Sequence, residues 1–150
     1  MITRIKKVTP ASEDSKGNIF DFWIDVELER GHEIVVYDKN YDLREFEGKK
    51  LGLILFAFEG MGKGDYEIIG EYKSKYKFSK DLLKRFKVPT HLLEYVTRNE
   101  LLEGFIEGGA IIKTVNGIFL ISEHNEFKED EYIIYNVSRF ELYYWYPPKE

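Results

Sequence analysis

A run of basic side chains is the part of this sequence best placed to bind a charged ligand. Between residues 72 and 88 there are seven Lys or Arg residues against one acidic residue, Asp81. On a strand, Lys73, Lys75 and Lys77 would share one face, because side chains alternate between the two faces. Such a row can meet phosphates or an acidic partner. The candidate binding residues of this basic strip are Lys73, Lys75, Lys77, Lys80 and Lys84.

The overall charge favours a structural role for the basic strip. The chain carries a formal net charge of −5, which argues against a general polyanion binder. Lysines on an edge strand also prevent edge-to-edge aggregation. We therefore expect edge protection first. Binding of single-stranded nucleic acid along residues 73–87 is the alternative.

Aromatic side chains form a second group of candidate binding residues. Trp23 interrupts a row of acidic side chains, Asp21, Asp25, Glu27 and Glu29, on one face of an alternating segment. Carboxylates two residues apart beside a tryptophan could bind a sugar or a cation, but we expect a solvated face with Trp23 covered by a neighbouring element. Near the C-terminus, Tyr143 and Trp145 either pack under another element or form an exposed interface.

The sequence gives no positive support for catalysis or for a metal site. It contains no cysteine, which excludes thiolate chemistry and Cys-ligated metals. The three histidines, His32, His91 and His124, are too scattered to predict a metal centre. Residues 60–64 (GMGKG) resemble a phosphate-binding loop, but no Ser or Thr follows the lysine, so a hairpin turn is the better interpretation. We predict no catalytic residue and no cofactor.

Composition places the chain among ordinary globular proteins. Its 150 residues are 43% hydrophobic, 33% charged and 16% aromatic, which predicts a single domain, residues 1–150, rich in strands. The first residues, MITRIKKVT, are too polar for a signal peptide, and no run is long enough to span a membrane. We expect a cytoplasmic protein with no membrane contact.

The strands and helices that position these residues are predicted on either side of one strongly apolar segment. Residues 51–58, LGLILFAF, indicate a central strand at about residues 50–58 that is buried on both faces. Helical spacing predicts a short helical block at about residues 79–106, and Asn116-Gly117 predicts a hairpin turn. No internal repeat is visible. We predict polar loops at residues 10–18 and 122–131, and further strands at residues 2–8, 19–29, 34–37, 66–78, 111–115, 118–121, 132–137 and 140–146.

The order of elements resembles an OB-fold barrel, mainly through the segments ERGHEIVVYD and FEGKKLGLILFAF. That fold has five strands with a helix between the third and fourth, and it binds ligands on the face of strands 2–3 and at the loops 1–2 and 4–5. The resemblance implies that these loops are residues 30–32 and 122–131. The second loop is strongly acidic and would repel phosphate, which favours a protein partner over a nucleic acid.

Three functions are therefore expected, in order. The first is a non-enzymatic β-barrel module that binds another protein. The second is a single-stranded nucleic-acid-binding domain that uses the basic strip. The third is a barrel that holds a small ligand in its interior, because tyrosine- and phenylalanine-rich interiors suit that role.

Overall fold

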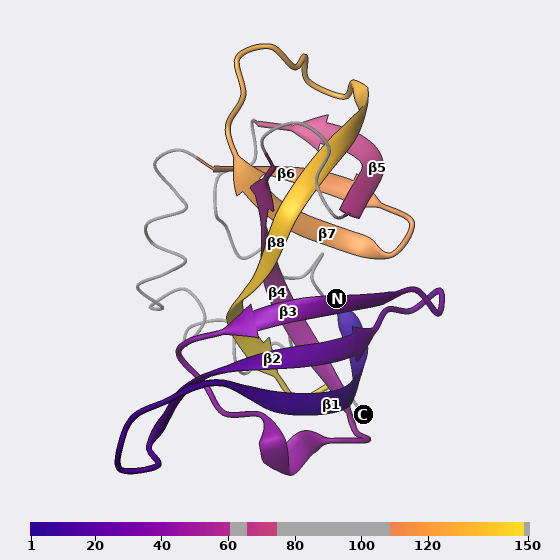
Figure 1. Ribbon diagram of the computed structural model, residues 1–150. Helices are drawn as coiled ribbons and strands as arrows, with labels where there is room; N and C mark the ends of the chain where they lie inside the picture. Colours follow the sequence, from indigo (N-terminus) through magenta and orange to yellow (C-terminus); the bar gives the residue numbers. More distant parts are fainter. Residues whose placement is uncertain (61–65, 75–108, 149–150) are drawn as a thin grey trace.

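The computed structural model describes residues 1–60, 66–74 and 109–148, and these residues are mainly β-structure. This part of the chain contains eight strands and a single turn of 3-10 helix. Figure 1 shows how the strands are arranged. The predicted helical block at residues 79–106 lies outside the described residues, as does the second half of the predicted strand at residues 66–78. The elements are β1 (Ile2–Glu13), β2 (Ile19–Glu27), β3 (Glu33–Asp38), η1 (Arg44–Phe46), β4 (Lys50–Glu59), β5 (Tyr66–Lys73), β6 (Gly109–Thr114), β7 (Gly117–Ser122) and β8 (Tyr132–Tyr146).

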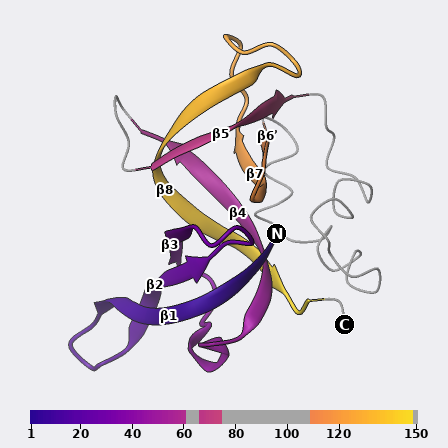
Figure 2. The same cartoon turned by 90° about the vertical axis from the view of Figure 1, so that its right-hand side faces the viewer.

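The eight strands form one sheet that closes on itself twice. Their order is β1-β2-β3-β8-β4-β7-β6-β5, with further pairings of β1 with β4 and of β8 with β5. The first ring therefore contains β1, β2, β3, β8 and β4, and the second ring contains β5, β6, β7, β4 and β8. In Figures 1 and 2 the strands β1–β3 lie at one end of the molecule and β5–β7 at the other, while β4 and β8 run through both.

The two rings repeat one pattern of strand pairing. In the first ring β1, β2 and β3 form an antiparallel meander, β3 runs parallel to β8, and β1 closes antiparallel on β4. In the second ring β5, β6 and β7 form the meander, β7 runs parallel to β4, and β5 closes antiparallel on β8. The fold therefore repeats internally in its strand pairing, although no repeat is visible in the sequence.

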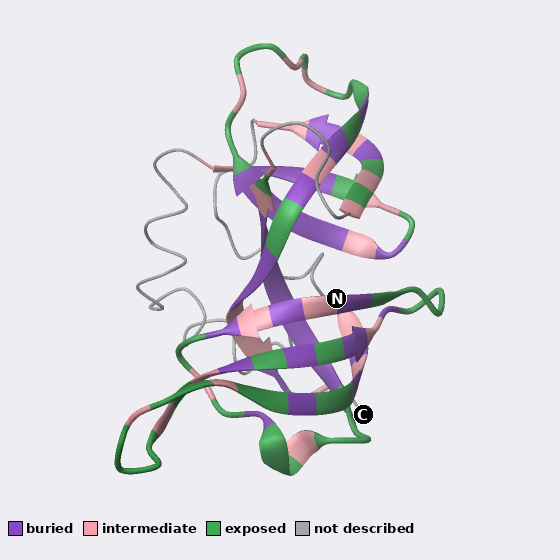
Figure 3. Cartoon of the chain, viewed as in Figure 1, coloured by how far each residue is buried: buried purple, intermediate pink, exposed green. Residues whose placement is uncertain are grey.

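Strand β4 is the shared centre, as the apolar stretch predicts. Leu53 and Leu55 have no exposed surface, and the strand pairs with β8 along most of its length. A strand that serves both rings is covered on both faces, which is why it contains no alternating polar residues. Figure 3 shows this continuous burial where β4 passes between the rings.

Strand β1 is longer than predicted, because residues 10–13 continue it where a loop was expected. Proline lacks an N–H and disfavours a strand that must pair on both edges. Here β1 pairs with β4 only at residues 2–4, so Pro10 needs a partner only on the β2 side. The pairing with β2 is also irregular beside Pro10, where the register shifts before Ser12. Both features accommodate the proline.

Strand β8 is a single strand, although two were predicted at residues 132–137 and 140–146. Its register with β4 skips one residue at Ser138 and another at Tyr143, so each forms a β-bulge. Each bulge shifts the alternation of buried and exposed residues along β8 by one position. The sequence pattern was therefore interpreted as two shorter strands.

The β6–β7 turn lies one residue earlier than predicted. Thr114 pairs with Gly117, and Val115-Asn116 forms the loop.

Candidate functional site

An aromatic pair with an exposed tryptophan marks the outer face of the first ring. Trp23 on β2 lies directly opposite Tyr37 on β3, and their ring centroids are 5.1 Å apart. Trp23 keeps 39% of its surface exposed, so it is not covered by a neighbouring element as we expected. The Tyr37 hydroxyl donates a hydrogen bond to Asp21, which raises the pKa of Tyr37. This bond holds the ring beside Trp23.

Strand β8 adds a cation to this pair. The guanidinium carbon of Arg139 lies 5.1 Å from the ring centroid of Tyr37 and 5.1 Å from that of Phe58. The bulge at Ser138 is adjacent in sequence, and the Ser138 hydroxyl donates to the Phe58 carbonyl at 3.2 Å. We call Trp23, Tyr37, Phe58 and Arg139 the aromatic platform. Its four residues come from four strands of the first ring.

A buried carboxylate anchors the cationic side of the aromatic platform. Glu141 is 2% exposed and accepts a hydrogen bond from Arg139 at 3.2 Å. Lys39 lies 3.1 Å from the other carboxylate oxygen of Glu141. Two cations on one carboxylate leave one positive charge in excess. On the opposite side, hydrogen bonds from Ser12 and Tyr37 lower the pKa of Asp21, so Asp21 stays ionised at neutral pH. The aromatic platform thus has one positive and one negative border.

An open depression accompanies the aromatic platform. Its volume is about 360 Å³, and its walls are Trp23, Val35, Tyr66, Ser138 and Arg139. Tyr66 belongs to β5 of the second ring, so the depression extends toward the junction between the two rings. The combination of aromatic faces, one guanidinium and a concave surface suits binding of a side chain or a planar group.

The basic strip lies mostly outside the described residues, which include only Lys73 from it. The Lys73 ammonium group contacts Asp130 and lies 3.6 Å from a Glu71 carboxylate oxygen. Its side chain is 15% exposed. Lys73 is therefore part of the attachment between β5 and the acidic loop at residues 123–131. Lys75, Lys77, Lys80 and Lys84 stay predictions.

The C-terminal aromatic candidates are partly covered by neighbours. Trp145 is half-buried and packs against Phe46 of η1, with ring centroids 4.9 Å apart. Tyr143, one of the two bulged residues, stacks on Phe56 at 5.1 Å and is also half-buried. Burial raises the pKa of Tyr143. These contacts leave Trp23 as the more accessible of the two tryptophans.

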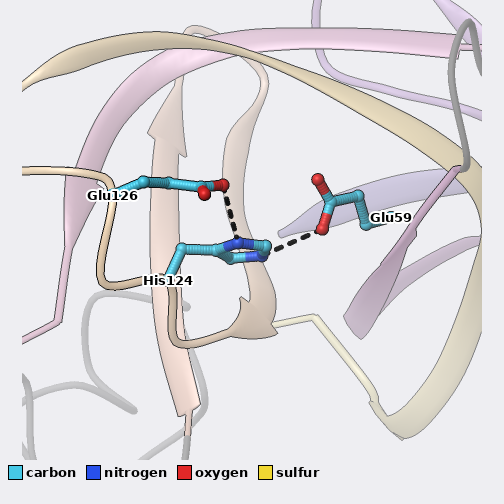
Figure 4. A group of neighbouring side chains, drawn as sticks. All are labelled: Glu59, His124 and Glu126. Atoms are coloured by element: carbon cyan, nitrogen blue, oxygen red, sulfur yellow. Dashed lines mark hydrogen bonds and ion pairs between the residues drawn. The ribbon is translucent and has the colours of Figure 1, made fainter.

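A second cluster gathers at the far end of β4. His124 lies between two carboxylates, with Nε2 at 3.2 Å from Glu59 and Nδ1 at 3.3 Å from Glu126, as Figure 4 shows. The Glu59 side chain comes from β4, and the other two come from the loop between β7 and β8. The loop is held by Tyr72, whose hydroxyl accepts a hydrogen bond from the His124 backbone N–H at 2.8 Å.

One imidazole and two carboxylates can bind a divalent cation, and one ligand atom from each residue lies within 4.8 Å of the others. However, the two carboxylates contact opposite ring nitrogens, and a single metal ion can bind only one nitrogen of the imidazole. We interpret the cluster as a set of polar contacts that attaches the loop to β4.

Sequence reasoning missed Tyr37, Arg139 and Glu59, for different reasons. The turn between β2 and β3 is centred on Arg30, and a regular hairpin about that residue places Trp23 opposite Tyr37. The turn predicted at residues 30–32 is centred one residue later and would place Trp23 opposite Lys39. Arg139 reaches Tyr37 only through the parallel pairing of β3 with β8, and Glu59 reaches His124 across the second ring. Neither contact leaves a local pattern.

None of the described helices is long and apolar enough to cross a membrane. Comparisons with protein-family models, with curated proteins and with solved structures find no match to this chain.

Proposed function

We propose that this chain is a non-enzymatic module that binds a partner protein through the aromatic platform. The observation that carries the proposal is an open depression lined by Trp23 and Arg139, both of which contact the Tyr37 ring. Tryptophan, tyrosine and arginine are the residue types that dominate binding energy at protein interfaces. Here they come from three different strands, so the fold fixes their relative positions.

The borders of the aromatic platform favour a protein over a nucleic acid. Asp21 and Asp25 flank Trp23 on the same face of β2, and they would repel a phosphate backbone running past the tryptophan. The excess positive charge near Arg139 is a single charge, shared with Lys39 and Glu141. A protein segment with an apolar side chain for the depression and a carboxylate for the Arg139 side matches both borders.

The position of the aromatic platform also agrees with an OB-like barrel. We infer such a barrel in the first ring, because its five strands close and the connection between its third and fourth strands, β3 and β4, contains η1. In that assignment β2 and β3 are the second and third strands, whose face binds ligands in OB-folds. Loop 1–2 is then residues 14–18, not residues 30–32, which instead connect β2 to β3.

The proposal is tested by placing a photo-crosslinking amino acid at position 23 and, as a matched control, at position 20. Phe20 is also an exposed aromatic residue of β2, but it does not line the depression. We expect a discrete crosslinked protein from native extract for position 23 only. With that protein purified, Trp23→Ala should weaken binding at least 30-fold, or about 2 kcal/mol, and Phe20→Ala should leave it unchanged. Equal crosslinking from both positions would contradict the proposal.

The nucleic-acid alternative needs its own measurement. Trp145→Phe leaves Trp23 as the single tryptophan and therefore as a fluorescent reporter of the aromatic platform. We expect titration with single-stranded oligothymidylate at low salt to leave this fluorescence unchanged. Salt-sensitive quenching at micromolar concentrations would instead support base stacking on Trp23 and replace the protein partner with a nucleic acid.

A further inference from the structure

The outer face of the second ring carries a group of exposed apolar side chains. Ile69 on β5 lies directly opposite Ile134 on β8. Tyr132 belongs to the same face of β8, because it precedes Ile134 by two residues. Val115, in the β6–β7 turn, borders the same small pocket as Ile69. Each of the four is more than half exposed, and we call Ile69, Val115, Tyr132 and Ile134 the apolar face.

The apolar face is contiguous, which distinguishes it from the single exposed apolar residues that most protein surfaces contain. Ile69 is central, with Ile134 on one side across the β5–β8 pairing and Val115 on the other side. Of the six large hydrophobic residues that are exposed in the described part of the chain, four belong to this face. Such a concentration of exposed apolar surface is typical of an interface with another macromolecule.

Two charges of opposite sign border the apolar face. Glu67 precedes Ile69 by two residues along β5. Lys113 on β6 lies opposite Glu71, which follows Ile69 by two residues, so Lys113 is on the same face but beyond Ile69. Glu71 already has the Lys73 ammonium group at 3.6 Å. Glu67 and Lys113 are exposed and form no ion pair with another described residue, so both are available to a partner.

We propose that the apolar face binds a second copy of the chain in a two-fold symmetric dimer, in which Glu67 of each copy pairs with Lys113 of the partner subunit. Glu67 and Lys113 lie diagonally across the row formed by Ile69 and Val115. A two-fold axis that runs along this row, in the plane of the interface, exchanges the two borders, so both ion pairs form at once. The apolar residues of the two copies then meet at the centre and leave water.

The two borders favour a second copy over an unrelated partner whose surface carries charges of one sign. An acidic surface would be attracted by Lys113 but repelled by Glu67, and the reverse holds for a basic surface. A second copy presents both signs in matching positions. Two copies repel each other at long range, because each carries a net charge of −5, so the dimer depends on this local match.

Sedimentation equilibrium of the purified full chain tests for the dimer. A concentration range from about 1 µM to about 1 mM includes the dissociation constants of moderate and weak dimers. We expect the weight-average mass to rise with concentration from that of one chain, 17.8 kDa, toward twice that value. The mass of a single chain throughout this range would overturn the proposal.

Two charge reversals test the assigned ion pairs. Glu67→Lys and Lys113→Glu each bring like charges together twice in a symmetric dimer, so each variant alone should dimerise at least about tenfold more weakly. An equimolar mixture of the two variants has opposite charges at both pairs and should dimerise as tightly as the wild type. A dimer that tolerates either reversal, or a mixture that stays monomeric, would overturn the proposal. If Lys113→Glu does not fold, because it lies opposite Glu71, the Glu67→Lys result decides alone.

The apolar centre is tested with a matched pair of variants. Ile134→Ser removes exposed apolar surface from both copies and should weaken dimerisation at least about tenfold. Phe20→Ser changes an exposed aromatic residue of β2 outside this face and should leave dimerisation unchanged. Trp23→Ala should also leave it unchanged, which separates this surface from the aromatic platform. Equal effects of Ile134→Ser and Phe20→Ser, or loss of the dimer in Trp23→Ala, would overturn the assignment to the apolar face.

Discussion

The two rings share one pattern of strand pairing but differ in what they present to solvent. The outer face of the first ring carries Trp23, Tyr37 and Arg139 among charged residues. The second ring exposes the aliphatic and aromatic side chains Ile69, Tyr132 and Ile134, and Glu67 and Glu71 flank Ile69 along β5. Both rings close on β4 and β8, whose inward residues are buried. The pairing pattern therefore depends on the shared strands, while the outer faces vary independently.

The largest expected effect comes from the strand that both rings share. Leu55 has no exposed surface, and Leu55→Ala should lower the free energy of unfolding by about 2–5 kcal/mol, because it leaves a cavity in a packed core. Chemical denaturation should show one shifted transition, since both rings lose packing together. A loss below about 0.5 kcal/mol, as surface changes give, would contradict the central place of β4.

A buried carboxylate makes the first ring sensitive to pH. Asp38, at the end of β3, has no exposed surface, and burial raises its pKa to about 6. Its Oδ1 accepts hydrogen bonds from the backbone N–H groups of Asn40 and Tyr41, while Oδ2 has no described partner. The corresponding buried groups of the second ring, Tyr72 and Tyr135, have pKa values raised above that of ordinary tyrosine by burial. They stay neutral throughout the acid range.

The sign of the Asp38 effect follows from this raised pKa. The folded state holds the proton below about pH 6, whereas the unfolded chain releases it near pH 3.8. The cost of burying the charge is therefore complete above pH 6 and disappears as the pH falls below 3.8. Between pH 7 and pH 4.5 the contribution of Asp38 to stability should increase by about 2 kcal/mol.

Asp38→Asn isolates this contribution, because its side-chain oxygen can still accept the two backbone hydrogen bonds. The difference in unfolding free energy between wild type and variant should change by about 2 kcal/mol between pH 7 and pH 4.5. Carboxylates with lowered pKa values that do not act on Asp38, such as Asp14 and Asp21, are present in both proteins and cancel in the difference. A difference that is independent of pH would show that Asp38 titrates at its ordinary value.

The strands that could be predicted from the sequence are those whose burial leaves a local pattern of apolar and polar residues. Alternation at residues 19–29 and the uncharged run at residues 51–58 identified β2 and β4, because burial on one face leaves an alternating pattern and burial on both faces leaves an uncharged one. The bulges at Ser138 and Tyr143 disturb that signal, so β8 was predicted as two strands. Trp23 was identified as a candidate from its acidic surroundings alone. Arg139, which lines the same depression, is brought near by the parallel pairing of β3 with β8, for which no local residue pattern exists.

The smallest expected effect compares one exposed cross-strand pair from each ring. Trp23 lies opposite Tyr37 between β2 and β3, and Ile69 lies opposite Ile134 between β5 and β8. Double-mutant cycles with alanine at each position would measure the coupling within each pair, and the Tyr37 hydrogen bond to Asp21 cancels in its cycle. We expect about 0.5–1 kcal/mol for the aromatic pair, whose rings are 5.1 Å apart, and less for the two isoleucines, which are 55% and 61% exposed.

The two coupling energies would show whether the outer faces differ in stability as well as in chemistry. A larger coupling for the aromatic pair means that the aromatic platform is already ordered before a partner binds, so binding loses less conformational entropy there. A larger coupling for Ile69 and Ile134 would reverse the comparison, because it would make the aliphatic face of the second ring the better-ordered surface. In that case the crosslinking experiment should be repeated from position 134.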